Sequence, residues 1–229
     1  KQWGDEVLNR LNGMFGLAIW DVRKKRLLVA RDPFGIKLVY YRIEGTRLFF
    51  GSEIRAVLQG TQDKIQVDPT SLNLFLRYRY TPSPYTLFKG IQKLPPGAKL
   101  VVEDGVARMS RWYRAKPIPF VPVKSDDEAR EELLALYKKS VERHLISDVP
   151  VGLLLSGGID SGLLLALMNL YGKSWPTYTV GYGTSYAQDE LADGAETARE
   201  LASSHHPVTL TRSTFETASR SSGHHGRRN

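Results

Sequence analysis

Short strands separated by turns are predicted from Met14 to Gly51. Residues 15–20 alternate Phe, Leu and Ile with Gly, Ala and Trp, the period of two expected of a strand. Further strands are predicted over residues 27–30, 38–42 and 47–50. Between them, residues 32–35 (Asp-Pro-Phe-Gly) have turn chemistry, because proline fixes φ and glycine can take a positive φ. No long helix interrupts the pattern, which therefore predicts one antiparallel sheet, and four strands are few for a whole domain.

Two short helices and two proline-rich stretches follow. Ser52 precedes a predicted helix over residues 53–58, and Ser71 is expected to cap another over 72–79. Residues 81–100 carry four prolines, which predicts a connecting stretch that ends in a strand over 99–102. Residues 116–124 carry three more and are predicted to form an extended linker.

Beyond residue 124 the apolar positions recur at helical spacing. Residues 125–128 (Ser-Asp-Asp-Glu) form a capping box, and the helix they begin is predicted to reach Leu145. The apolar run from Val151 to Leu155 is typical of a strand buried on both faces. The pattern then predicts helix, strand, helix and strand over residues 162–170, 177–181, 190–202 and 207–210. Such alternation indicates a parallel sheet with right-handed crossovers.

Composition sets limits on the class of protein. The 229 residues are 41% hydrophobic and 24% charged, as in ordinary globular proteins of one large or two small domains. A net charge of +8 fits binding to polyanions, either nucleic acid or nucleotide phosphates. The sequence has no cysteine, which excludes disulfides, thiolate zinc sites and a cysteine nucleophile within it. Without a membrane-length apolar run or a signal-peptide pattern, we expect a cytoplasmic protein.

The most informative segment is the loop at residues 156–161, Ser-Gly-Gly-Ile-Asp-Ser, between a predicted strand and a predicted helix. Glycines let the backbone approach a ligand, and the amides of a helix N-terminus favour an anion. Asp160 would repel a bare phosphate, so its expected partner is Mg²⁺ held jointly with phosphate oxygens. The loop has no lysine and no GxGxxG pattern, which weighs against a Walker loop and a dinucleotide site. An ordinary turn with a serine cap is the structural alternative.

This loop resembles the pyrophosphate loop (PP-loop) of the ATP pyrophosphatases, which activate a carboxylate as an adenylate. Other blocks resemble the glutamine-hydrolysing asparagine synthetases in family order between Leu11 and Leu210. Residues 11–21, 30–37 and 51–58 resemble the late part of the amidotransferase domain of those enzymes. Residues 86–97 resemble the junction, and residues 148–152 lead into the loop as in the family.

The resemblance implies a mixed α/β fold with two partial domains. The remainder of an antiparallel N-terminal-nucleophile amidotransferase sheet would occupy residues 1–60, and a connecting segment and linker residues 61–124. The first part of a parallel-sheet ATP pyrophosphatase domain would occupy residues 125–212. Residues 213–229 are expected to be a disordered tail, because residues 217–229 contain almost no apolar side chains.

The activity implied by the resemblance is ATP-dependent amide ligation. Aspartate would be adenylated by ATP with Mg²⁺ and then aminated by ammonia derived from glutamine. The expected small-molecule partners are therefore ATP, aspartate, and glutamine or ammonia, with neither a membrane nor a nucleic acid, and the full-length family is compatible with a homodimer. The resemblance assigns Asp160 to Mg²⁺ through the phosphates. It assigns ATP and pyrophosphate binding to Leu155, Ser156, Gly157, Gly158, Ile159, Asp160, Ser161, Val180 and Gly181.

The same resemblance predicts that this polypeptide alone makes no asparagine from glutamine. The family's glutaminase nucleophile is an N-terminal cysteine, which this sequence lacks. The later acidic glycine loop that completes the synthetase site in the family has no counterpart after Leu210. Two alternatives stay open, namely another PP-loop enzyme such as a tRNA-modifying ligase, and a truncated non-catalytic product that binds nucleotide.

Several other polar residues have both a functional and a structural interpretation. Arg31 and Asp32 could line an interdomain path or form a turn. Glu53 could face the domain junction or begin a helix, and Asp189-Glu190 could be an acidic pair near the synthetase site or a helix cap. The histidine pairs 205–206 and 224–225 lack the spacing of a metal motif. Scattered arginines are expected to form a solvated face rather than a nucleic-acid surface: Arg77, Arg79, Arg111 and Arg114.

Overall fold

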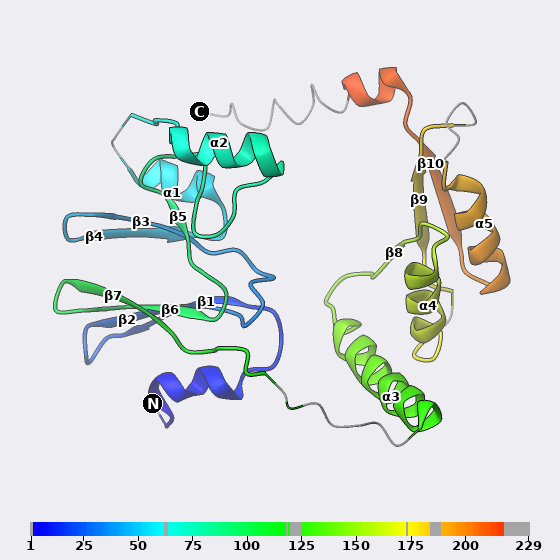
Figure 1. The fold of residues 1–229 in the computed structure, drawn as a ribbon, viewed down its shortest axis with the longest axis horizontal. Coiled ribbons are helices and arrows are strands. Elements are labelled where there is room, and N and C mark those ends of the chain that lie inside the picture. Colours follow the sequence, from blue (N-terminus) through cyan, green and yellow to red (C-terminus); the bar gives the residue numbers. More distant parts are fainter. Residues whose placement is uncertain are drawn as a thin grey trace. The chain divides into compact units, whose positions relative to one another are not determined.

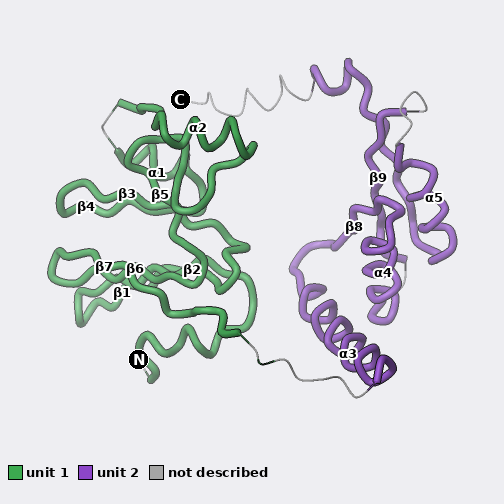
Figure 2. The backbone as a smooth tube through the Cα atoms, viewed as in Figure 1, with its two compact units in different colours: residues 1–119 green, residues 120–229 purple. Residues whose placement is uncertain are grey.

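A computed structural model describes residues 2–61, 64–117, 119, 125–172, 174–183 and 189–217 of the chain. The chain divides into two compact units, residues 1–119 and residues 120–229 (Figure 2). In the described residues, no helix is long and apolar enough to cross a membrane.

Unit 1 contains two antiparallel sheets rather than the single sheet predicted from the sequence (Figure 1). After a 3-10 helix, η1 (Gly4–Arg10), the first sheet has the order β1-β2-β6-β7 and the second the order β4-β3-β5. The strands of the first sheet are β1 (Gly16–Asp21), β2 (Arg26–Arg31), β6 (Ala98–Glu103) and β7 (Val106–Arg111). Those of the second are β3 (Tyr40–Glu44), β4 (Arg47–Gly51) and β5 (Gln92–Lys93).

The turn after β2 explains why one sheet becomes two. Gly35 has a φ of +69° and donates its N–H to the carbonyl of Asp32 at 3.2 Å, so the predicted turn is confirmed. The chain then leaves the first sheet, and Tyr40 pairs with Gly51 and Lys93 in the second. One core joins the two layers: Val29, Val39, Tyr41, Leu94, Ala98 and Leu100.

Residues 61–119, predicted as a connecting segment, lie in unit 1. The predicted strand over 99–102 is confirmed as β6, which pairs with β2, while β7 was not foreseen. Because β6 supplies the inner partner of β2, this segment completes the first sheet instead of leading away from it. Most of the predicted linker, residues 118 and 120–124, lies outside the described residues.

Helices α1 (Ile54–Gly60) and α2 (Pro69–Tyr78) follow the second sheet hairpin. Ser71 does not cap α2 as predicted. The cap is Asp68, whose carboxylate accepts the N–H of Ser71 at 2.7 Å, and Pro69 takes the first helical position, where its missing N–H is no loss. Ser71 lies in the first turn and is 2% exposed.

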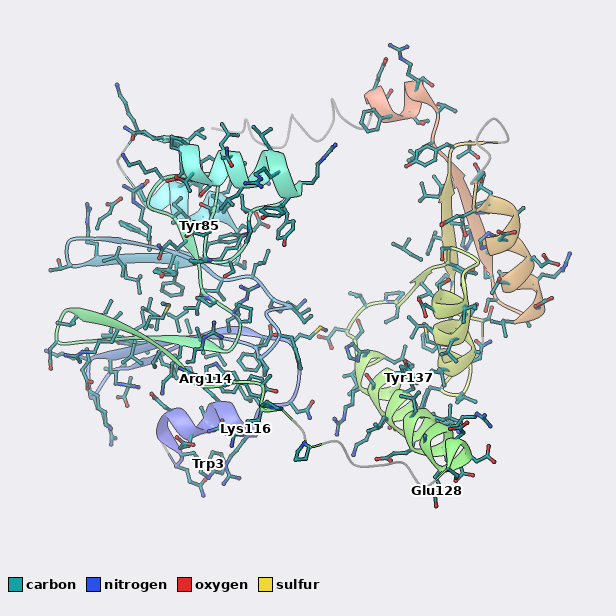
Figure 3. The ribbon with its side chains drawn as sticks, viewed as in Figure 1. Trp3, Tyr85, Arg114, Lys116, Glu128 and Tyr137 are labelled. Carbon is teal, nitrogen blue, oxygen red and sulfur yellow. The ribbon has the colours of Figure 1, made fainter. Side chains whose placement is uncertain are left out.

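Unit 2 alternates helix and strand as predicted. Helix α3 (Asp126–His144) begins at Ser125, whose Oγ accepts the N–H of Glu128 at 3.2 Å; Glu128 is labelled at this end of α3 in Figure 3. The parallel sheet has the order β10-β9-β8. Its strands are β8 (Leu153–Leu154), β9 (Thr177–Gly181) and β10 (His205–Thr209), and the helices between them are α4 (Ile159–Met168) and α5 (Leu191–Glu200).

Only one face of this sheet is covered by described residues. Leu155 packs with Leu165 of α4 and Ala198 of α5 and is 1% exposed. Leu154 points to the other face and is 74% exposed. The prediction of a strand buried on both faces over residues 151–155 is therefore wrong at Leu154, because α4 and α5 both lie on the side of Leu155.

The last described residues include a helical turn. Residues 212–217 form a helical turn, and the N–H of Phe215 donates to the carbonyl of Thr211 at 3.0 Å. This turn lies inside the stretch for which the sequence predicts disorder. Residues 218–229, which include His224 and His225, lie outside the described residues.

Candidate functional site

The loop between β8 and α4 is shaped by a glycine in the left-handed region. Gly157 has a φ of +75°, and a Cβ built on it would lie 2.5 Å from Cβ of Asp193 and 2.6 Å from its carbonyl carbon. No side chain fits there. Gly158 has an ordinary φ of −76°, and its Cβ would meet only Ser156 Oγ, at 3.4 Å. Of the two glycines, only Gly157 thus has the restricted conformation that the sequence predicts for both.

The two serines of the loop are bonded to each other and to the backbone. Ser161 Oγ donates to the carbonyl of Gly158 at 3.1 Å, so Ser156 Oγ is the donor in the 3.0 Å contact between the two hydroxyls. Ser156 Oγ in turn accepts the N–H of Gly158 at 3.3 Å, and Ser161 Oγ accepts the N–H of Ser156 at 3.3 Å. This ring of hydrogen bonds curls the chain tightly between strand and helix.

Helix α4 begins directly after this curl. Gly158 is its N-cap residue, and no side chain caps the helix. The N–H groups of a first helical turn have no partner within the helix, and together with the helix dipole they form a site for an anion. The N–H groups of the first turn of α4 therefore follow directly after the curled loop, and the binding of an anion there stays a prediction.

Asp160 and Ile159 occupy the first turn of α4 and are exposed, Ile159 to 89%. Among the described residues, no group of three or more His, Cys, Asp or Glu side chains could hold a metal ion. One carboxylate beside two hydroxyls is a sparse donor set for Mg²⁺. It fits this ion when phosphate oxygens and water supply the other ligands, the usual arrangement for Mg²⁺ on nucleotides.

The residues expected around adenosine lie at the carboxyl edge of the sheet, where ligands bind in open α/β folds. The side chain of Leu155 is buried, so only its backbone is available at this edge. Its N–H donates to the carbonyl of Tyr178 at 2.8 Å, and its carbonyl accepts the hydroxyl of Thr179. Val180 is 43% exposed on the uncovered face, and Gly181 ends β9. The structure brings the strand ends and the loop to one edge.

Asp189 binds backbone N–H groups at the start of α5, which favours the structural alternative for the acidic pair. Its carboxylate accepts the N–H groups of Tyr182, Gly183 and Leu191 at 2.9, 2.6 and 2.8 Å. The neighbouring Glu190 is the N-cap residue of α5 but makes no side-chain cap hydrogen bond.

Three features behind the loop were not foreseen from the sequence, namely Thr179, Asp193 and Gly194. A Cβ on Gly194 would collide with Thr179 Oγ1 and lie 3.1 Å from the carbonyl of Leu155. These contacts join residues far apart along the chain, so no local sequence motif predicts them. A glycine inside a helical pattern, Gly194, is the one sequence signal of close packing.

Arg31 and Asp32 bind backbone groups and shape the turn after β2. Arg31 donates to the carbonyls of Lys37 and Leu94, both at 2.7 Å, and of Gly35 at 2.5 Å. Burial raises the pKa of Asp32, but hydrogen bonds from backbone N–H groups, those of Lys37 and Ile36 foremost, outweigh it and hold the pKa below its ordinary value. These contacts give the pair a structural role.

The other candidates also have local structural partners. Glu53 is the N-cap residue of α1, without a side-chain cap bond, and lines a cavity of about 320 Å³ with Leu38, Tyr40 and Phe88. His205 Nδ1 lies 3.0 Å from Thr177 Oγ1, and His206 stacks on Tyr178 with ring centroids 5.1 Å apart. Among the arginines, Arg77 lies over the ring of Tyr78, and Arg111 donates to the carbonyl of Pro96 at 3.3 Å.

Comparison with known proteins gives consistent matches for both units. Residues 1–113 match the family described as glutamine amidotransferase domain, and residues 132–221 match the family described as asparagine synthase. The chain is 34% identical over 185 residues to glutamine-hydrolysing asparagine synthetase 1 of Bacillus subtilis, covering 80% of this chain and 28% of that protein.

Two further relatives are also asparagine synthetases by name. A putative asparagine synthetase of Mycobacterium tuberculosis is 34% identical over 186 residues, 79% of this chain and 28% of that protein. Asparagine synthetase B of Escherichia coli is 28% identical over 223 residues, 91% of this chain and 34% of that protein. The chain therefore spans about a third or less of the length of these relatives.

Proposed function

The chain belongs to the family of the glutamine-hydrolysing asparagine synthetases, and from this we propose that residues 156–161 bind the pyrophosphate part of ATP during amide ligation. The observation that carries the proposal is the curled loop at Gly157, followed by a helix without a side-chain cap. Backbone N–H groups gathered at a helix start bind phosphate oxygens. Both serine hydroxyls lie at the same curl.

In the proposed reaction, a side-chain carboxylate oxygen of aspartate attacks the α-phosphorus of ATP. The bond to the bridging oxygen breaks, and pyrophosphate leaves with that electron pair. Ammonia then attacks the acyl carbon of the resulting β-aspartyl adenylate, loses a proton, and AMP departs. The loop's role is to hold the leaving phosphates in position and to stabilise their growing charge.

We propose Asp160 as the residue that holds Mg²⁺. When bound, Mg²⁺ would neutralise charge on the phosphate oxygens that share it with this carboxylate. Leu155, through its backbone, and Val180 and Gly181, through the end of β9, would border the adenosine. The described part of the chain offers these groups at one sheet edge, which supports the assignment.

The 229 residues include no cysteine, so they hold no thiol for glutamine hydrolysis. We therefore propose that this polypeptide binds Mg-ATP but makes no asparagine from glutamine. Supplied ammonia would not restore synthesis, because the chain spans about a third or less of its relatives' length. Turnover of aspartate, ammonia and ATP by the purified chain would contradict this proposal.

Calorimetric titration of the 229-residue chain with Mg-ATP tests the binding site. We expect measurable binding by the wild-type chain and clearly weaker binding by Asp160→Ala, with Asp127→Ala as a control. Asp127 pairs with Arg130 on the exposed surface of α3, away from the loop. Equal and negligible binding by wild type and Asp160→Ala would favour a truncated product without activity and would contradict the proposed site. Steeply salt-dependent tRNA binding would favour a tRNA-modifying ligase.

A further inference from the structure

The carboxylate of Asp189 links the end of β9 to the start of α5. One oxygen, Oδ2, accepts the N–H groups of Tyr182 and Gly183, and the other, Oδ1, accepts that of Leu191. These backbone hydrogen bonds, the one from Leu191 foremost, hold the pKa of Asp189 below its ordinary value. The side chain therefore stays anionic at neutral pH and binds both elements at once.

The side chains of Asp189 and Leu191 leave no room for a side chain at Gly181. A Cβ on Gly181 would lie 2.6 Å from Asp189 Oδ1 and closer still to Cγ of Leu191. Since only a glycine leaves room at position 181, the carboxylate and the first residue of α5 are packed directly against the end of β9. The start of α5 is thus fixed by both sterics and hydrogen bonds.

The first turn of α5 is also the wall behind the loop. The position of a Cβ on Gly157 is 2.5 Å from Asp193 Cβ and 2.8 Å from the N atom of Gly194. On the other side, Gly194 lies against Thr179 and the carbonyl of Leu155. Any shift of the start of α5 therefore moves or releases Gly157.

We propose that Asp189 is a positioning residue for the phosphate-binding loop. By fixing the first turn of α5 behind Gly157, its carboxylate keeps the loop in the curled form that accepts pyrophosphate. Asp189 does not contact the ligand in this proposal and acts only through α5. That the ligand is pyrophosphate rests on the proposed function.

The test compares Asp189→Ala and Asp189→Asn with Glu196→Gln in the 229-residue chain. Glu196→Gln removes one charge from the same helix, where Glu196 pairs with Arg199 at 3.4 Å on an exposed face. Affinities for Mg-ATP and for Mg-pyrophosphate are measured below the unfolding temperature of each variant. We expect Asp189→Ala to weaken both by about tenfold or more, the scale seen when a supporting contact of a site is lost. Glu196→Gln should bind both as the wild type does.

Asp189→Asn keeps an oxygen for Leu191 but turns an NH₂ group toward the N–H groups of Tyr182 and Gly183. Its affinities for Mg-ATP and Mg-pyrophosphate should lie between those of the wild type and Asp189→Ala. If Asp189→Ala does not fold, the affinities of Asp189→Asn test the positioning role. A merely structural role would lower the unfolding temperature and leave both affinities unchanged in the folded variants. That result would overturn the proposal.

Amide hydrogen exchange of residues 157–161, followed by NMR without nucleotide, separates this inference from the proposed function. We expect faster exchange in Asp189→Ala and wild-type rates in Glu196→Gln. Failure of the wild-type chain to bind either ligand would end the proposed function, whereas the exchange rates would still decide the role of Asp189. Unchanged exchange in a folded Asp189→Ala variant would refute positioning whatever the affinities are.

Discussion

Gly157 lies so close to Asp193 that a single added methyl group at position 157 would overlap the first turn of α5. The contact joins the loop after the first strand of unit 2 to the helix after the second strand. The packed unit therefore supports the loop in addition to the hydrogen bonds that the loop residues make among themselves.

Replacing Gly157 by alanine should destabilise unit 2. The residue would have to keep a φ of +75° and push α5 away, and each of these effects costs about 1–3 kcal/mol. Urea unfolding followed by circular dichroism measures the loss. In the matched variant Gly158→Ala, φ is ordinary and the new Cβ meets only Ser156 Oγ, at 3.4 Å, so its stability should stay within about 0.5 kcal/mol of wild type. Equal stability of the two variants would contradict this view of the loop.

Leu154 is exposed and its neighbour Leu155 is buried. Substitution by alanine should therefore lower the free energy of unfolding at Leu155 and hardly change it at Leu154. Leu155→Ala removes a side chain that is 1% exposed and should cost about 2–5 kcal/mol. Leu154→Ala changes a side chain that is 74% exposed and should leave the unfolding midpoint almost unchanged. A large loss at Leu154 in urea unfolding would show that its face is covered in solution.

Gly194 and Thr179 should be energetically coupled. Gly194→Ala alone forces the new methyl group onto Thr179 Oγ1 and should destabilise by about 1–3 kcal/mol. Thr179→Ala alone removes the hydroxyl that donates to the carbonyl of Leu155, at a cost of about 1–3 kcal/mol. The double variant relieves the collision, so its loss should be smaller than the sum of the two. A double-mutant cycle measures this, and strict additivity would argue against the contact.

Unit 1 should lose stability in acid through Asp5. Its side-chain hydrogen bond with Arg26, assisted by Lys99, lowers the pKa of Asp5 from 3.8 to about 2, with Arg26 donating at 2.8 and 2.7 Å. A lowered pKa in the folded state gives stability that is present above the unfolded pKa and is lost as pH falls toward the folded one.

The expected loss therefore falls between about pH 4 and pH 2. Asp5→Asn should be less stable than wild type at pH 7 and should differ little from it at pH 2. Glu6→Gln, which loses a carboxylate that accepts from Asn9 on an exposed turn, is the control. Thermal unfolding at several pH values gives the comparison, and parallel curves for wild type and Asp5→Asn would contradict the prediction.

Local chemistry predicted the elements well where a short signal decides them. The capping box at Ser125, the turn at Gly35 and the alternation of unit 2 all depend on neighbours in sequence. The sequence prediction misplaces the cap of α2 because Ser71 and Asp68 are both good caps. Pro69, which favours the first helical position, makes Asp68 the cap.

Sheet partners and the walls of the site depend on contacts between distant residues. Nothing in residues 26–31 indicates that β6, far along the chain, is their partner. In the same way, the loop sequence predicts a tight turn at the glycines. It does not show that Asp193 lies where a side chain at position 157 would have to be. The uncovered side of Leu154 was missed because an apolar run does not reveal how many layers will cover it.

The wall that α5 places behind Gly157 also sets an order of events during synthesis. The six loop residues leave the ribosome well before Leu191–Glu200 do, and at that moment nothing stands behind them. A nascent chain that ends before Leu191 therefore lacks the contact between Gly157 and Asp193. Under the proposed function, nucleotide binding would have to wait until the whole stretch from β8 to α5 is translated.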